Sequence, residues 1–193
     1  NLLVMLLLTM LAAIIMGMGL PTSAAYVILA VLTSPALIEL GVTPLAAHFF
    51  IFFFACISTI TPPVALSAYA GAGIAGSDPM KTGWTAFTLG LAGYIVPFLA
   101  VYKPSVMLIG TPFLPSLIDV SFSMIAVISM TFTVSGFLGK RKLPIYIRIA
   151  FAVLSALIFL DTGNWADLIA TIGIIALWAI LHILQKKDAS QYP

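Results

Sequence analysis

The stretch Thr59-Ile60-Thr61-Pro62-Pro63 lies in the middle of an apolar run and decides how this chain can fold. Residues 48–55 before it and residues 64–69 after it are apolar enough to lie in lipid. Each proline removes a backbone N–H and crowds the preceding turn, and Thr61 ahead of Pro62 is driven out of the α region. We therefore expect a helix that breaks here and leaves neighbouring carbonyls without helical donors.

Two interpretations of this break are open. At membrane depth, freed backbone groups are tolerated only where protein buries them or where they face a watery cavity. The break is surrounded by the hydroxyl side chains of Ser58, Thr59, Thr61 and Ser67. Such oxygens suit an ion or substrate site in a discontinuous transporter helix, and they favour that interpretation. The alternative is a proline kink that is healed by neighbouring helices and threonine hydroxyls.

Composition sets the class of protein. Hydrophobic residues make up 62% of the 193 residues and charged residues 7%, against about 45–50% and about 25% in soluble domains. Several apolar runs exceed the ~20 residues that cross a bilayer. The sequence therefore predicts an all-α, polytopic membrane protein. The single cysteine, Cys56, lies in an apolar run and permits no disulfide framework, so we expect it to be a packing residue.

The N-terminal residues predict a helical hairpin over residues 1–38. An apolar run ends at Pro21, which suits the start of a second helix, and Thr22 and Ser23 can satisfy its free amides. The second arm has only about 15 residues and is interrupted by Thr33, Ser34 and Pro35, which is short for a crossing. We interpret the hairpin as re-entrant, with its tip at residues 17–23, where Gly17 and Gly19 permit close approach. Two spanning helices joined by a tight loop are the alternative.

The remaining elements follow in order. We expect a discontinuous helix over residues 43–76, a spanning helix over 84–103 that bends at Pro97, and a C-terminal membrane extension over 115–193. This extension is predicted to hold about three helices, at about 117–138, 145–160 and 168–184. Asp161 and Asp167 are expected in an outer turn, as solvated loop residues. Residues 1–110, ahead of the extension, hold the hairpin, the discontinuous helix and the spanning helix.

Charge placement predicts the orientation. Counting crossings from the hairpin places seven of the eight basic residues on one face and leaves only Lys103 on the other. By the positive-inside rule the basic face is cytoplasmic, and the C-terminus lies there too.

The chemistry present is that of a transporter and not of an enzyme. The sequence holds no phosphate loop and no assignable serine–histidine or cysteine–histidine pair, and His48 and His182 have no metal-ligand neighbours. No charged residue falls in the middle of a span, Asp119 being the nearest, so a carboxylate proton relay is not expected. The carbonyls and hydroxyls of the hairpin tip (residues 17–23) and of the proline break remain, and such oxygens hold Na⁺. We expect a secondary transporter with a Na⁺ site.

Two motifs and the loop between the helices carry a family resemblance. The run Gly17-Met18-Gly19-Leu20-Pro21-Thr22-Ser23-Ala24-Ala25, followed by Ile60-Thr61-Pro62-Pro63-Val64-Ala65-Leu66, resembles the second half of the large membrane subunit of TRAP transporters. Residues 75–83, leading into Leu89-Gly90 and Ile95-Val96-Pro97, resemble the fused TRAP permeases, in which small and large membrane subunits share one chain. The resemblance covers about residues 1–110. Residues 115–193 resemble the extension of some fused members.

The resemblance implies an elevator-type transporter in the cytoplasmic (inner) membrane of a bacterium or archaeon. Its activity would be Na⁺-driven symport of small organic anions, usually carboxylates or dicarboxylates, delivered by a soluble periplasmic substrate-binding protein. No cofactor is implied beyond Na⁺ as coupling ion, and no nucleic-acid partner. The first hairpin and its broken helix would lie upstream of Asn1, so we expect this chain to be a fragment of a longer permease.

By the same resemblance, the tip and the break would form one half of the ion and substrate site. The candidate residues are Gly17, Gly19, Pro21, Thr22, Ser23, Ser58, Thr59, Thr61, Pro62 and Ser67. The candidate Na⁺ ligands are Thr22, Ser23, Thr59 and Thr61. Many large subunits carry an acidic residue at the tip, where this chain has Pro21 and Thr22. Two other functions remain open: a free-standing Na⁺/carboxylate symporter with hairpins, and a non-transporting membrane assembly subunit whose proline breaks are packing kinks.

Overall fold

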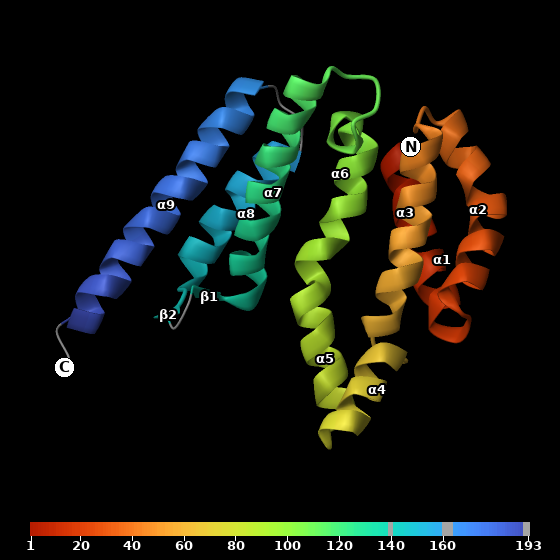
Figure 1. The fold of residues 1–193 in the computed structure, drawn as a ribbon, viewed down its shortest axis with the longest axis horizontal. Helices are drawn as coiled ribbons and strands as arrows, with labels where there is room; N and C mark the ends of the chain where they lie inside the picture. Colours follow the sequence, from red (N-terminus) through yellow and green to blue (C-terminus); the bar gives the residue numbers. More distant parts are fainter. Residues whose placement is uncertain (139–140, 160–163, 191–193) are drawn as a thin grey trace. The chain divides into compact units, whose positions relative to one another are not determined.

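The computed structural model describes residues 1–138, 141–159 and 164–190, and these residues are almost entirely helical (Figure 1). The chain divides into two compact units, residues 1–109 and residues 110–193. Five described helices are long and apolar enough to cross a membrane: Leu2–Gly19, Thr22–Glu39, Pro79–Tyr102, Phe113–Ser135 and Trp165–Ile183. The predicted class, an all-α polytopic membrane protein, is confirmed.

The first unit begins with the hairpin formed by α1 (Leu2–Gly19) and α2 (Thr22–Glu39). Helix α2 has 18 residues and runs through Pro35, so the expected short arm of about 15 residues and the expected interruption at Thr33, Ser34 and Pro35 are both wrong. A single proline removes one helical hydrogen bond. Ser34 and Leu37, on either side of Pro35, are buried, and their packing carries the helix past it.

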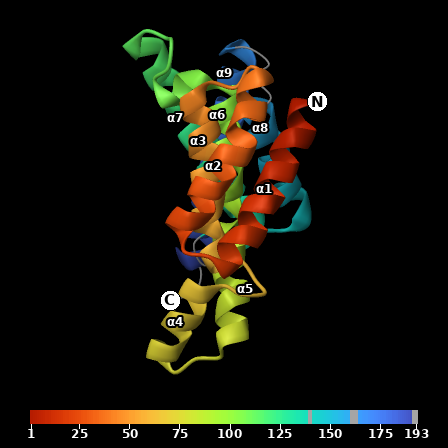
Figure 2. The same cartoon turned by 90° about the vertical axis from the view of Figure 1, so that its right-hand side faces the viewer.

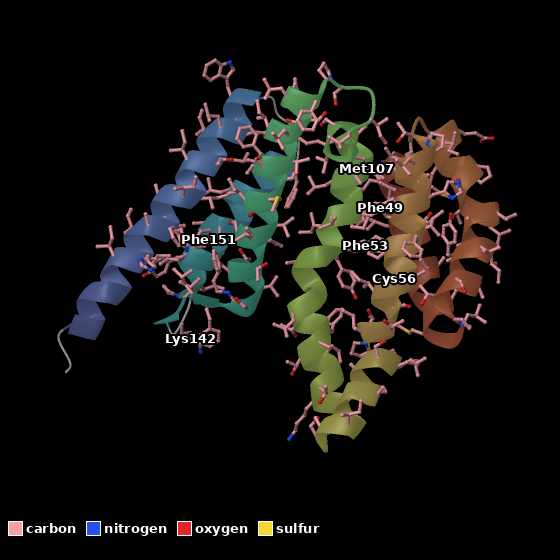
Figure 3. All side chains as sticks on the ribbon, viewed as in Figure 1. Phe49, Phe53, Cys56, Met107, Lys142 and Phe151 are labelled. Atoms are coloured by element: carbon pink, nitrogen blue, oxygen red, sulfur yellow. The ribbon has the colours of Figure 1, made fainter. Side chains whose placement is uncertain are left out.

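Helix α3 (Pro44–Ile57) is the centre of the first unit, with the hairpin on one side and α6 on the other (Figure 1). Phe50, Ile51 and Phe54 are fully buried in its core. The Phe50 ring meets the Phe98 ring of α6 edge-on, with centroids 5.1 Å apart. Phe53 of α3 lies on the side of α3 that faces the helical residues 91–102 (Figure 3). A Cβ added to Gly93 would be 4.0 Å from the tip of the Phe53 ring.

The helical path stops after α3. A short 3₁₀ turn, η1 (Ser58–Ile60), leads into the irregular residues 61–65, which contain a cis Pro62–Pro63 peptide, and helix α4 (Leu66–Ala75) follows. Ala65 occupies the left-handed region at φ 33°, which residues other than glycine rarely adopt. The structure therefore has a non-helical turn at the two prolines.

The chain then crosses the unit in one continuous stretch of α5 (Pro79–Gly90), η2 (Leu91–Ile95) and α6 (Val96–Tyr102). It begins at Pro79 and not near Trp84, because the Asp78 carboxylate accepts from the Lys81 amide at 2.8 Å and Pro79 starts the helix. The stretch departs from α-helical geometry at the 3₁₀ segment η2, which ends two residues before Pro97, the residue at which a bend was expected. A short 3₁₀ turn, η3 (Pro104–Met107), closes the unit.

The second unit is a three-helix arrangement of α7 (Phe113–Ser135), α8 (Ile145–Phe159) and α9 (Asn164–Ser190). The expected helix over 117–138 is wrong at both ends. Helix α7 already begins at Phe113, directly after Pro112. It ends before Gly136, which has a φ of 70° and whose amide bonds back to the Phe132 carbonyl. A two-stranded ladder follows, β1 (Phe137–Leu138) with β2 (Arg141–Lys142). Phe151 of α8 is fully buried within the unit (Figure 3).

Asp167 is not a solvated loop residue as expected. It lies in the first turn of α9 and is 1% exposed. Asp167, Ala170, Thr171 and Ile174 are all buried and recur at the spacing of one helix face, which turns Asp167 inward. Asp161 lies outside the described residues.

Candidate ion-binding site

The end of the first hairpin helix lies directly on the break. A Cβ placed on Gly17 would be 2.2 Å from the Ser58 hydroxyl oxygen and 3.0 Å from the Ala55 carbonyl oxygen. Only glycine leaves room for this approach. The hairpin and the discontinuous helix thus meet through Gly17 and the fully buried Ser58.

Three hydroxyls at the break turn back onto helix α3. Ser58 Oγ donates to the Ala55 carbonyl at 2.7 Å, Thr59 Oγ1 to the Cys56 carbonyl at 2.8 Å, and Thr61 Oγ1 to the Ile57 carbonyl at 2.8 Å. A hydroxyl has one proton and two acceptor lone pairs. These oxygens therefore satisfy the last carbonyls of α3 with their protons and keep lone pairs for other partners.

The backbone of the break is rearranged around the prolines. The Ser58 carbonyl, whose helical donor would be Pro62, accepts instead from the Thr61 amide at 3.1 Å. The Thr59 carbonyl would take its helical donor from residue 63, a proline without an N–H. The Pro63 carbonyl accepts from the Tyr69 hydroxyl at 2.6 Å. Carbonyl and hydroxyl oxygens are thus concentrated over a few residues, which is the donor set that suits a hard monovalent cation.

Tyr94 joins the break from the neighbouring stretch. Its hydroxyl lies 2.5 Å from Thr61 Oγ1. Its ring meets the rings of Phe54 and Phe87 edge-on, with centroids 5.8 and 5.7 Å away. This contact could not be predicted from the sequence, since nothing local to residue 94 marks it as a neighbour of residue 61.

Glycines let the break lie close to α5. A Cβ on Gly83 would be 2.9 Å from the Tyr69 ring, and a Cβ on Gly90 would be 2.8 Å from Ile60 Cδ1. Because Gly83 and Gly90 have no side chains, α5 can pack closely against Ile60, before the prolines, and against Tyr69, after them.

The other predicted residues lie further outward. Gly19, Pro21, Ser23 and Ser67 are exposed, and Thr22 and Pro62 are half-buried. Within residues 1–138, no hydrogen bond joins the side chains of Thr22 or Ser23 to the break. The structure thus unites Gly17, Ser58, Thr59 and Thr61, and leaves the tip hydroxyls of the half-buried Thr22 and the exposed Ser23 apart from them.

His48 has a defined polar role that the sequence analysis did not predict. Its Nδ1 lies 3.1 Å from the Tyr26 hydroxyl and its Nε2 lies 3.2 Å from the Ser34 hydroxyl, so it ties α2 to α3. The spacing of Tyr26 and Ser34 on one face of α2 was the available signal. Among the described residues no group of three or more His, Cys, Asp or Glu could hold a metal.

The comparisons with known proteins agree with this architecture. Residues 1–117 match the family described as Tripartite ATP-independent periplasmic transporter, DctM component. No curated protein and no solved structure matches the chain. The matched residues contain the hairpin, the break and the α5–α6 stretch. The chain belongs to the TRAP transporter family, as an integral membrane chain of the large permease component.

Proposed function

We propose that this chain forms part of a Na⁺-coupled secondary transporter that takes up small organic anions, carboxylates in particular, handed over by a soluble periplasmic binding protein. The observation that carries the proposal is the junction of Gly17 with Ser58. It joins the end of a hairpin arm to an oxygen-rich helix break inside the region shared with the TRAP permeases.

The break supplies the ligands in this proposal. Thr59 and Thr61 use their protons on carbonyls of α3, so their oxygens can turn lone pairs toward a cation. The Thr59 carbonyl adds a third oxygen that lacks a helical donor. Thr22 and Ser23 would complete the shell if the hairpin tip moves inward, and the N-terminus of α2 would favour the anionic substrate.

The two hairpin arms are shorter than the stretch beside them, although each is long enough to cross a membrane by itself. Arms of 18 residues reach about 27 Å, whereas the 24-residue stretch from Pro79 to Tyr102 reaches about 36 Å. α4 and the first part of α5 extend past the tip of the hairpin in both views (Figure 1 and Figure 2). We infer that the tip and the break lie inside the bilayer when α5–α6 spans it.

The orientation is part of the proposal. In the second unit, the chain direction places β2 and the last residues of α9 at the same end, and both carry basic residues, Arg141, Lys142, Lys186 and Lys187. The opposite end carries Trp165 and Asp167. The positive-inside rule then places the basic end and the C-terminus in the cytoplasm of a bacterium or archaeon.

Uptake of labelled carboxylates into proteoliposomes tests the function. The complete permease would be reconstituted with and without a Na⁺ gradient, and with and without its binding protein. The proposal predicts uptake only when both are present. Uptake that needs Na⁺ alone would identify a free-standing symporter. No uptake from a folded sample with a broad panel of anions would favour an assembly subunit.

A further inference from the structure

The Thr61 hydroxyl has a determined hydrogen-bond direction. Its oxygen contacts two partners, the Ile57 carbonyl at 2.8 Å and the Tyr94 hydroxyl at 2.5 Å. The carbonyl can only accept, so the single proton of Thr61 goes to Ile57, and Tyr94 must be the donor in the second bond. One lone pair of Thr61 Oγ1 is then left, and its direction is set by the other two bonds.

Tyr94 is held so that it can impose this direction. Its ring lies between Phe54 of α3 and Phe87 of α5, and its residue belongs to the 3₁₀ segment η2. The ring is partly buried and meets both of these rings edge-on, which favours one orientation of the side chain. The Tyr94 hydroxyl therefore acts as a fixed donor, while the Thr61 side chain on the irregular turn is the group that it orients.

We propose that Tyr94 is a positioning residue of the ion site, which orients the Thr61 hydroxyl so that its remaining lone pair faces the cation. This inference rests on the proposed function, because it assigns Tyr94 to the same Na⁺ site. Tyr94 does not touch the ion in this account. It acts only through Thr61, and it links occupancy of the break to the α5–α6 stretch.

Tyr94→Phe keeps the ring and removes the hydroxyl. We expect the Na⁺ concentration for half-maximal uptake to rise about three- to tenfold, the effect of one lost hydrogen bond. The KM for the anion at saturating Na⁺ and the maximal rate should stay within about twofold of wild type. Tyr102→Phe is the matched control, since Tyr102 is exposed at the end of the same helical stretch, and it should leave the Na⁺ dependence unchanged.

A double-mutant cycle separates positioning from general destabilisation. Because Tyr94 acts through Thr61, adding Tyr94→Phe to Thr61→Val should not shift the Na⁺ dependence further. The Na⁺-induced rise in Tm of the purified permease gives a second reading that needs no transport. Additive shifts, an unchanged Na⁺ dependence in Tyr94→Phe, or a loss of maximal rate alone would each overturn the inference. A wild-type protein without Na⁺ dependence would instead overturn the proposed function.

Discussion

The hydroxyls at the proline break of the first unit differ in their surroundings from the buried hydroxyls between α7 and α8 of the second unit. In the first unit, Ser58, Thr59 and Thr61 donate to carbonyls three or four residues earlier on their own helix, at a point where that helix ends. In the second unit, Ser129 donates to the Phe151 carbonyl at 3.3 Å, and Ser155, which bonds the Phe151 carbonyl of its own helix at 2.8 Å, also reaches the Ala126 carbonyl at 3.2 Å. The Ser129 bond and the longer Ser155 bond cross between α7 and α8, which are unbroken.

The difference shows what marks a site in an apolar chain. Hydroxyls between continuous helices hold the helices together, because a buried hydroxyl in lipid needs a partner. Hydroxyls next to two prolines lie where the backbone has lost two N–H donors. Carbonyl and hydroxyl oxygens therefore gather there that are not all used in helical hydrogen bonds. The proline break, and not the presence of serine or threonine, separates the candidate site from ordinary packing.

The largest effect on uptake is expected at the junction of hairpin and break. Gly17→Ala would place a methyl group 2.2 Å from the Ser58 oxygen and 3.0 Å from a backbone oxygen, so α1 must move away from η1. We expect a loss of about 1–3 kcal/mol in stability and of most Na⁺-driven uptake. Thermal unfolding and uptake of the full permease would be measured together.

A control and a rescue make that test sharper. Gly73→Ala, with nothing within 4 Å of its added methyl, should change neither quantity. Combining Gly17→Ala with Ser58→Gly removes the clashing side chain and should recover part of the stability. Full stability of Gly17→Ala alone would show that the hairpin does not rest on the break.

The next prediction concerns the stability of the second unit. Arg148 donates from Nε to the Thr133 carbonyl at 2.8 Å and from Nη2 to the Val134 carbonyl at 3.3 Å, so it caps the end of α7. Arg148→Met should cost about 1.5–3 kcal/mol, because charged hydrogen bonds are lost. Tm would fall while the Na⁺ dependence of uptake stays the same. Lys142→Met, at an exposed position, is the control. A change in Na⁺ dependence would mean that the second unit also affects the ion site.

A similar or somewhat smaller effect is expected at His48. His48→Phe removes both ring nitrogens and leaves the Ser34 hydroxyl, on a residue that is 3% exposed, without this partner. A loss of about 1–3 kcal/mol is expected. Tyr26→Phe removes only one of the two bonds and should cost less. Equal losses in the two variants would argue against the bond to Ser34.

The smallest effect tests the packing hydroxyls. Ser155→Ala removes a hydroxyl that is shared between the Phe151 carbonyl of its own helix and the Ala126 carbonyl of α7, and bonds between helices contribute about 0.6 kcal/mol in membrane proteins. The variant should lower Tm slightly and leave uptake unchanged. A strong loss of uptake without unfolding would place the second unit in the transport cycle itself.

The sequence predicted what depends on local chemistry. Apolar content and the absence of charge within spans predicted the membrane class, and Pro21, Pro62 and Pro63 indicated where backbone could not stay helical. Asp78 and Pro79 likewise suit a helix start, although the expected boundary was placed later. These signals need no knowledge of the neighbours of a residue.

The contacts between elements could not be predicted in the same way. Gly17 was expected to permit a close approach, but its partner, Ser58, depends on how α1 lies on α3. Tyr94 lies far along the chain from Thr61 and has no distinguishing neighbours. Asp167 was taken for a loop residue because acidic residues near a turn are usually solvated, whereas the inward face of α9 buries it.

The Na⁺ activation curve of Thr61→Val tests the central claim most directly. Valine keeps the shape of threonine and removes the hydroxyl that lies between the Ile57 carbonyl and Tyr94. The curve would be measured on the full permease beside Ser155→Ala, whose lost hydroxyl belongs to helix packing. The account predicts that Thr61→Val needs about tenfold more Na⁺, the effect of losing about 1.4 kcal/mol of binding, and that Ser155→Ala needs the same as wild type. Identical curves for all three proteins would contradict an ion site at the break.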